Sequence, residues 1–251
     1  MRVPLLISSA ALFVPLTASS QVVEHDRMPR GYNKHPVTVP AAATCPAERD
    51  RNSVLNRLMS RTDPIPNYGW VWVTVDAIKN LEWPRAAGRV ERFLWGAILT
   101  PAQRDSIRAF EGTPVAVDGY LLVDYDLRRP GVATEAMEKA SRGCNLTGDQ
   151  VNYHFWLTPH RDQSRADAIP ITVTPQMRQQ GWDLAKLDDI ARHGRMVRVW
   201  GWLLFDQARP DSYAARSRQS NTVTTPWQVY PIVEIEVFHK RSLVPLREWE
   251  E

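Results

Sequence analysis

The sequence predicts an α+β protein whose main domain is a small five-stranded OB-like β-barrel, preceded by an N-terminal helical extension. Three observations predict this fold. Five strand-like segments follow residue 112, one well-marked helix separates the third from the fourth, and ten Trp residues favour packed β structure. The order β-β-β-α-β-β is that of an OB barrel, and a twisted open sheet with the same elements is the alternative.

The first 20 residues have the pattern of a secretory signal peptide. Arg2 precedes a mostly apolar run over residues 3–16, and Ala18 and Ser20 supply small residues before the cut. The run is too short for a stable membrane span, and no other segment is long and apolar enough. We therefore expect an exported protein, periplasmic or extracellular. A buried N-terminal helix is the alternative, which two prolines in the run disfavour.

Residues 21–44 are rich in proline and show no hydrophobic period, which is typical of a flexible leader. The segment 45–112 is expected to form the helical extension that packs on the barrel. Its best-marked helix starts after Thr100, because Pro101 suits the first helical position and Gln103 completes a capping box. Gly112 is expected to end this helix.

Two earlier elements are also expected in the extension. The apolar spacing within residues 45–61 predicts a helix. The run that begins WVWV at residue 70 starts like a strand. From Thr74 it has the alternative of becoming helical, with three apolar residues on one side: Val75, Ile78 and Leu81.

The two cysteines, Cys45 and Cys144, are expected to form a disulfide if the chain is exported. The bridge would close a loop of about 100 residues and add roughly 4–5 kcal/mol on the chain-entropy model. Two unpaired thiols in a chain that is not exported are the alternative. Without matching histidines the pair does not indicate a zinc site.

The barrel is expected over residues 113–240, followed by a C-terminal tail over 241–251. Its helix is expected over 176–194, with Gly194 as the stop. The five strands are expected at 113–126, 150–159, 168–175, 196–207 and 226–240.

The fourth strand, MVRVWGWLLFDQ, is apolar on both faces. The face expected inside the barrel carries Val197, Val199, Gly201, Leu203 and Phe205. The outer face carries Arg198, Trp200, Trp202 and Leu204. Gly201 suits a tight bend. The outer face is too apolar to be left in water, so we expect the N-terminal extension to cover it. A groove in which Arg198 and Trp200 reach a ligand is the alternative.

No catalytic motif is present: the chain lacks a nucleophile elbow, a P-loop, a dinucleotide-binding glycine pattern and HExxH. His154 lies in the middle of a strand, where a single histidine between aromatic residues is more often a core residue than a base. A metal site needs several converging ligands, which the sequence does not show. We therefore assign no catalytic residue, metal or cofactor. The candidate ligand-binding residues are His154, Arg198, Trp200, Trp202, Gln228 and Tyr230.

The charge balance gives weak support for nucleic acid as a ligand. The chain has 31 basic and 28 acidic residues, a net charge of +3, whereas polyanion binding needs clustered charge. A basic loop over residues 208–225 could hold a nucleic-acid strand beside the Trp-rich strands. A solvated loop is the simpler interpretation.

Short motifs run through residues 100–240, namely Thr174, Pro175, Trp182, Leu187, Gly194, Val197, Gly201, Trp202, Trp227, Pro231, Ile235, Glu236 and Val237. Together they resemble a family of uncharacterised exported bacterial proteins with an OB-like barrel. The resemblance implies export and fold class but no established activity. The family pattern has Glu where Thr172 stands, and Glu and His where Gln228 and Tyr230 stand. A family site built from histidine and carboxylates would therefore be incomplete in this chain.

Three functions are compatible with the sequence. The favoured one is a non-enzymatic exported binding module, whose ligand is an oligosaccharide, a peptide or a nucleic acid that stacks on tryptophan. The second is a hydrolase or metal-dependent enzyme with a degenerate site around His154. The third is a structural protein with a partner in the cell envelope.

Overall fold

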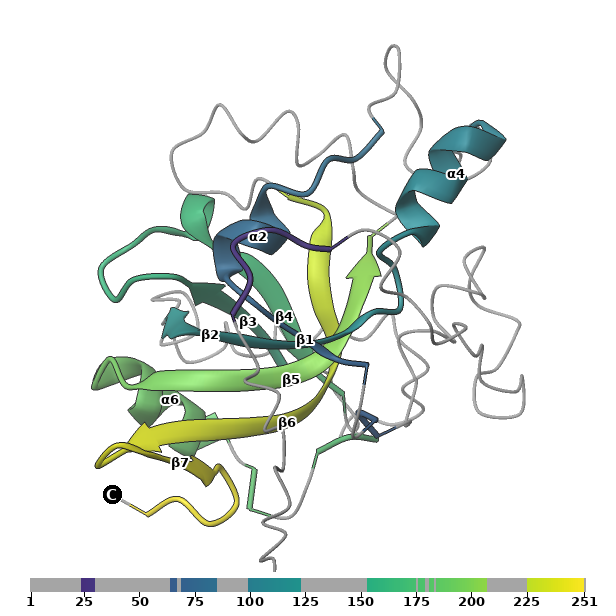
Figure 1. Cartoon of the computed structure of the whole chain (residues 1–251). Coiled ribbons are helices and arrows are strands. Elements are labelled where there is room, and N and C mark those ends of the chain that lie inside the picture. Colours follow the sequence, from purple (N-terminus) through teal and green to yellow (C-terminus); the bar gives the residue numbers. More distant parts are fainter. Residues whose placement is uncertain are drawn as a thin grey trace, which may run out of the picture.

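The computed structural model describes residues 24–29, 64–66, 69–84, 99–122, 153–174, 176–178, 181–182, 184–206 and 225–250. Figure 1 shows a curved sheet with short helices around it. In chain order the elements are β1 (Val71–Val73), α2 (Val75–Lys79), α4 (Pro101–Arg108), β2 (Pro114–Leu122), β3 (Tyr153–Thr158), the 3-10 helix η3 (Arg165–Asp167), β4 (Ile169–Val173), α6 (Leu184–Arg192), β5 (Met196–Phe205), β6 (Trp227–His239) and β7 (Ser242–Pro245).

The strands close into a five-stranded barrel, as predicted, and not into the alternative open sheet. The sheet runs in the order β1-β2-β3-β4-β6-β5, and pairing between β2 and β5 closes the five strands β2, β3, β4, β6 and β5 into the barrel. β4 and β6 run parallel, whereas the other barrel strands pair antiparallel. β1 adds a parallel strand to the first half of β2, and β7 adds an antiparallel strand to the end of β6.

The barrel core is formed by the inward faces of the strands, as the alternation in the fourth barrel strand, β5, predicts. Five residues of that strand alternate along it and are buried: Val197, Val199, Gly201, Leu203 and Phe205. Gly201 marks a close approach between strands, because a Cβ there would lie 2.5 Å from Val229 Cγ1 and 2.7 Å from the Pro231 carbonyl oxygen. The pairing of β5 with β6 changes register on both sides of Gly201. The strand pairing is therefore irregular at this glycine, where the sequence predicts a bend.

Two helices begin where their sequences predict. The Thr100 hydroxyl accepts from the Gln103 N–H, and the Gln103 side chain accepts from the Thr100 N–H, so the predicted capping box is formed. Thr74 caps α2 by accepting from the Ala77 N–H at 3.0 Å. α2 then turns its apolar side, Ile78 included, into the core against β2, β4 and β6.

The third helix is shorter than predicted. The sequence predicts a helix over 176–194, but α6 begins only at Leu184. Gly181 has a φ of 89°, a left-handed conformation that an α-helix cannot contain, and this interrupts the predicted run. The predicted stop is confirmed, since Gly194 also has a positive φ of 55°.

The last residues belong to the folded core. The N–H of Leu246 donates to the carbonyl of Ile235 at 2.8 Å, which continues the contact made by β7. Leu246 and Trp249 are buried, and Lys186 of α6 donates to the Trp249 carbonyl at 3.1 Å. The segment 241–251 thus contains a strand and two core side chains.

Several predictions fall outside the described residues. These are the signal peptide, the helix over 45–61, the basic loop over 208–224, and both Cys45 and Cys144. Of the leader over 21–44, only 24–29 is described, where His25 pairs with β1 through its N–H to the Trp72 carbonyl at 2.8 Å. Of the helical extension, α2 and α4 are described. Among the described residues, no helix has the length and apolar character to cross a membrane.

Candidate functional site

A polar cluster lies on the outer face of β3, β4 and β6. His154 of β3 is half-buried and pairs across the strands with Thr172 of β4. Their side chains meet at 2.8 Å between His154 Nδ1 and Thr172 Oγ1, in a hydrogen bond whose direction depends on the histidine tautomer. Thr172 is fully buried, so this bond fixes the orientation of the imidazole.

β6 contributes two more members of the cluster, because Val229 pairs with Ile171 of β4. Gln228 and Tyr230 flank Val229 and therefore lie on the outer face. The Tyr230 ring meets the His154 ring edge-on, with 6.3 Å between ring centres. Gln228 and Tyr230 are only 6% and 3% exposed. We call His154, Thr172, Gln228 and Tyr230 the polar cluster.

Trp156 lies beside the polar cluster, two residues after His154 on the same face of β3. The guanidinium of Arg165 sits over its ring, 4.0 Å from the ring centre, in a cation–π contact. Burial lowers the pKa of Arg165 from its ordinary value. Both side chains are half-buried, so this pair borders the solvent. Sequence reasoning missed the pair, because the two residues meet only after β3 and β4 turn back on each other.

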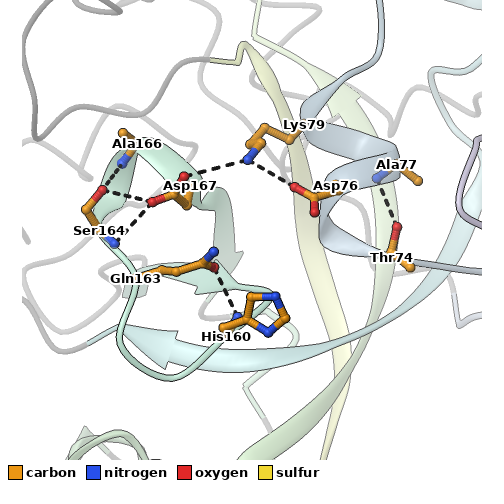
Figure 2. Close-up of polar contacts among 9 residues, drawn as sticks. All are labelled: Thr74, Asp76, Ala77, Lys79, His160, Gln163, Ser164, Ala166 and Asp167. Atoms are coloured by element: carbon orange, nitrogen blue, oxygen red, sulfur yellow. Dashed lines mark hydrogen bonds and ion pairs between the residues drawn. The ribbon is translucent and has the colours of Figure 1, made fainter.

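Local hydrogen bonds order the loop between β3 and β4, which carries Arg165 (Figure 2 shows the bonds of Ser164, Ala166 and Asp167). Ser164 caps η3 by accepting from the Ala166 N–H at 3.3 Å, and the Asp167 carboxylate accepts from the Ser164 hydroxyl at 3.1 Å. Lys79 of α2 lies between Asp76, at 3.0 Å, and Asp167, at 3.8 Å. These ion pairs tie α2 to the loop that carries Arg165.

Arg198, a predicted ligand contact, is engaged within the sheet instead. It faces Asp118 across β5 and β2, with hydrogen bonds of 2.6 Å from Nε and 2.8 Å from Nη2. Its guanidinium also lies 4.3 Å from the centre of the Trp72 ring. The hydrogen bond to Asp118 raises the pKa of Arg198, more than burial lowers it. The pair crosses the outer face of the barrel.

Trp200 is engaged in the same way. Its indole N–H donates to a carboxylate oxygen of Glu236 at 2.7 Å, and its ring packs edge-on against Trp70 with 4.6 Å between ring centres. Glu236 pairs directly with Arg198 in the register of β5 and β6. Trp202, on the same face of β5, is 3% exposed and lies opposite Pro114.

Five of the six predicted ligand contacts therefore divide into two groups, and the sixth, Trp202, is buried opposite Pro114. His154, Gln228 and Tyr230 come together with Thr172 near the start of β6. Arg198 and Trp200 lie with Glu236 near its other end, where their polar atoms bond to carboxylates of the barrel. Arg198 and Trp200 are partly exposed but bond to Asp118 and Glu236, whereas in the polar cluster His154 is partly exposed, with Trp156 beside it.

Glu111 is a buried carboxyl group that sequence reasoning also missed. It follows α4 and accepts a hydrogen bond of 3.3 Å from the Phe205 N–H. Burial raises the pKa of Glu111 to about 7, despite the opposing effects of that bond and of Arg108. Its only signal in the sequence is an acidic residue beside a helix end, which is too common a pattern to single it out.

Within the described ranges, no group of three or more His, Cys, Asp or Glu side chains is arranged to hold a metal ion. In comparisons with known proteins, the chain matches no family model, no curated protein and no solved structure. The resemblance to exported bacterial proteins therefore stays a prediction.

Proposed function

We propose that the protein is an exported, non-enzymatic binding module of the OB type, which holds an oligosaccharide on the outer face of β3 and β4. The observation that carries the proposal is the combination of His154 with Trp156 on that face. Both side chains are half-buried, and each has a partner: Thr172 bonds to the imidazole, and Arg165 lies over the indole ring.

The strand order supports the OB assignment. Five strands in the sequence order β2, β3, β4, β5 and β6, with α6 between the third and fourth, close with β4 parallel to β6. In OB folds the second and third strands form the face that binds oligosaccharides and oligonucleotides. Here those strands are β3 and β4, which carry His154, Trp156 and Thr172.

The chemistry of the face favours a neutral ligand rich in hydroxyl groups. The polar cluster consists of an imidazole, a hydroxyl, an amide and a phenol, which donate and accept hydrogen bonds without a fixed charge. Trp156 supplies an apolar ring of the kind that packs against sugars. Arg165 supplies one cation beside Trp156, whereas an oligonucleotide would need several. We therefore place an oligosaccharide ahead of a peptide or a nucleic acid.

The polar cluster has two layers of side chains. His154 and Trp156 would contact the ligand, because they are the partly exposed members of this face. Thr172 and Tyr230 are buried and touch the imidazole from behind, so they act as positioning residues. The module would reach its ligand after export with loss of the signal peptide over 1–20, and Cys45 and Cys144 would form a disulfide in that oxidising compartment.

The test is a glycan-array screen of the secreted protein followed by calorimetric titration of the best oligosaccharide. Trp156→Leu is expected to lower affinity at least tenfold, whereas Trp70→Leu, a half-buried tryptophan beside Trp200, serves as the matched control. Equal affinity in both variants would remove the stacking role of Trp156. Selective binding of a peptide or single-stranded DNA would overturn the oligosaccharide assignment.

The same samples decide between binding and catalysis. Incubation with the bound oligosaccharide should return it intact, as judged by mass spectrometry. Shorter products that disappear in His154→Ala would overturn the non-enzymatic assignment and favour a hydrolase with its site around His154. Mass spectrometry of the secreted chain also tests export, since cleavage after Ser20 leaves a mature protein that starts at Gln21.

A further inference from the structure

The hairpin between β6 and β7 turns on two basic residues in the left-handed conformation. Lys240 and Arg241 have φ values of 45° and 73°, and they connect the paired residues His239 and Ser242. A two-residue turn of this kind favours Asn-Gly, because a Cβ is strained at positive φ. Both side chains are exposed, and neither makes an ion pair with the described residues. Lys240 and Arg241 are therefore exposed cations at two positions where Asn and Gly would form the turn with less strain.

A third exposed cation, Arg161, lies at the end of α6. A Cβ on Gly194 would collide with the guanidinium of Arg161, so this side chain rests directly on the backbone that ends the helix. A cation is favourable at a helix C-terminus, which explains its position. Among the described residues Arg161 also makes no ion pair, which leaves its guanidinium donors open to a ligand.

The register of the sheet brings these cations together. β5 begins at Met196, two residues after Gly194, and its Val197 pairs with Val237 near the end of β6, so the end of α6 and the β6–β7 turn lie at the same end of this strand pair. In Figure 1 the β3–β4 loop, the start of β5 and the β6–β7 turn all end at the left side of the barrel. We call Arg161, Lys240 and Arg241 the basic edge.

The neighbouring charges leave the basic edge positive. On α6, Asp188 forms an ion pair with Arg192, whereas Asp189 lies 3.1 Å from His193 Nδ1, a contact that is an ion pair only when the histidine is protonated. Asp162, exposed beside Arg161, is the acidic group that opposes it most directly.

We propose that the basic edge docks the protein onto membranes that contain anionic phospholipids. Its cations stand on turns along one side of the barrel, an arrangement that suits a plane of phosphate groups. The β3–β4 loop from Pro159 to Ser164, the turn at 193–195 and the turn at 240–241 contain no Phe, Tyr or Trp, and their only aromatic rings are the imidazoles of His160 and His193. They therefore lack the stacking surface with which proteins hold single-stranded nucleic acid. The proposal does not depend on the oligosaccharide face, although the β3–β4 loop carries Arg161 of the basic edge as well as Arg165.

The expected affinity is modest and sensitive to salt. A cation beside an anionic bilayer contributes about 1 kcal/mol, which is about fivefold in binding for each residue. Three such residues give reversible docking that fades as ionic strength rises.

The test is cosedimentation of the full mature chain with vesicles of phosphatidylcholine alone, or with a quarter of phosphatidylglycerol, at low salt. The parent is expected to bind only the anionic vesicles. The variant Lys240→Asn with Arg241→Gly should bind them about 25-fold more weakly, because two cations are lost. It should also unfold at a higher temperature, because Asn-Gly relieves the turn. Asp162→Asn should bind about fivefold more tightly.

In the Asn-Gly variant, vesicle binding should fall while the unfolding temperature rises, so weaker binding cannot be attributed to a less stable fold. Undiminished binding by a well-folded Asn-Gly variant, or equal binding to neutral vesicles, would overturn the proposal. Stronger binding of a single-stranded DNA probe than of anionic vesicles would assign the edge to nucleic acid instead. Trp156→Leu should bind vesicles like the parent, so failure of the oligosaccharide proposal would be seen independently.

Discussion

Arg198 and Asp118 face each other across β5 and β2, joined by two hydrogen bonds although they lie 80 residues apart in the sequence. Each side chain is about 15% exposed, so the pair is largely withdrawn from water. Loss of one partner leaves the other as an uncompensated charge on the outer wall of the barrel.

Arg198→Ala is therefore expected to destabilise the fold by about 3 kcal/mol, because Asp118 loses its partner and Trp72 loses a packing contact. The double variant Asp118→Ala with Arg198→Ala should be less destabilised than the sum of the two single variants. Urea denaturation of all four proteins measures this coupling. Strict additivity of the two single changes would show that the pair is not energetically linked.

Gly201→Ala is expected to cost about 1–3 kcal/mol through overpacking, because the added Cβ would collide with Val229 and with the Pro231 carbonyl. Adding Val229→Ala removes one of the two obstacles and should recover part of the loss. Thermal denaturation of the single and double variants checks the order. A Gly201→Ala protein as stable as the parent would mean that β5 and β6 separate there without cost.

Glu111 makes stability depend on pH. In the folded state the Glu111 carboxyl has a pKa of about 7, whereas its ordinary value is 4.5. The folded state therefore keeps this proton more tightly than the unfolded state, and stability falls as pH rises between these values. Above pH 8 the loss amounts to about 3 kcal/mol. Glu111→Gln should remove this slope and be more stable than the parent at pH 8.

Urea denaturation between pH 4 and pH 9 measures this difference. Asp105→Asn, which alters an exposed carboxylate of α4, is the matched control and should keep the parent slope. A slope that survives in Glu111→Gln would assign the pH dependence to another group.

Trp249→Ala is expected to destabilise the protein by about 3–5 kcal/mol, because this buried side chain packs near the C-terminus against the core. Glu250→Ala changes the exposed neighbour and should leave stability unchanged. Chemical denaturation distinguishes the two. Equal stability of both variants would show that the last residues are a dispensable tail.

Local signals in the sequence predict most of the fold. The capping box at Thr100 and the stop at Gly194 depend on residues a few positions apart, and the strands follow from alternation along single segments. The β6–β7 hairpin escaped prediction for the same reason, because its turn residues, Lys240 and Arg241, are not those that signal a turn.

The candidate site is less predictable, because its contacts cross between strands. His154 was singled out as one side chain, but its bond to Thr172 requires the register of β3 on β4. For Arg198, nothing in the sequence shows whether its side chain contacts a ligand or pairs with Asp118. The side chain of Arg165 reaches Trp156 only through the loop that Ser164 and Asp167 fix.

Closure of the barrel by β2 and β5 also determines when the barrel can form during synthesis of the chain. β2 ends at Leu122, and the strand that seals its open edge runs to Phe205, so the two edges meet only after both have left the ribosome. Until then the backbone groups along that side of β2 have no partner and can pair with another chain. High contact order of this kind slows folding and prolongs exposure to aggregation. A nascent chain that stalls between these strands would therefore carry an open edge for as long as the stall lasts.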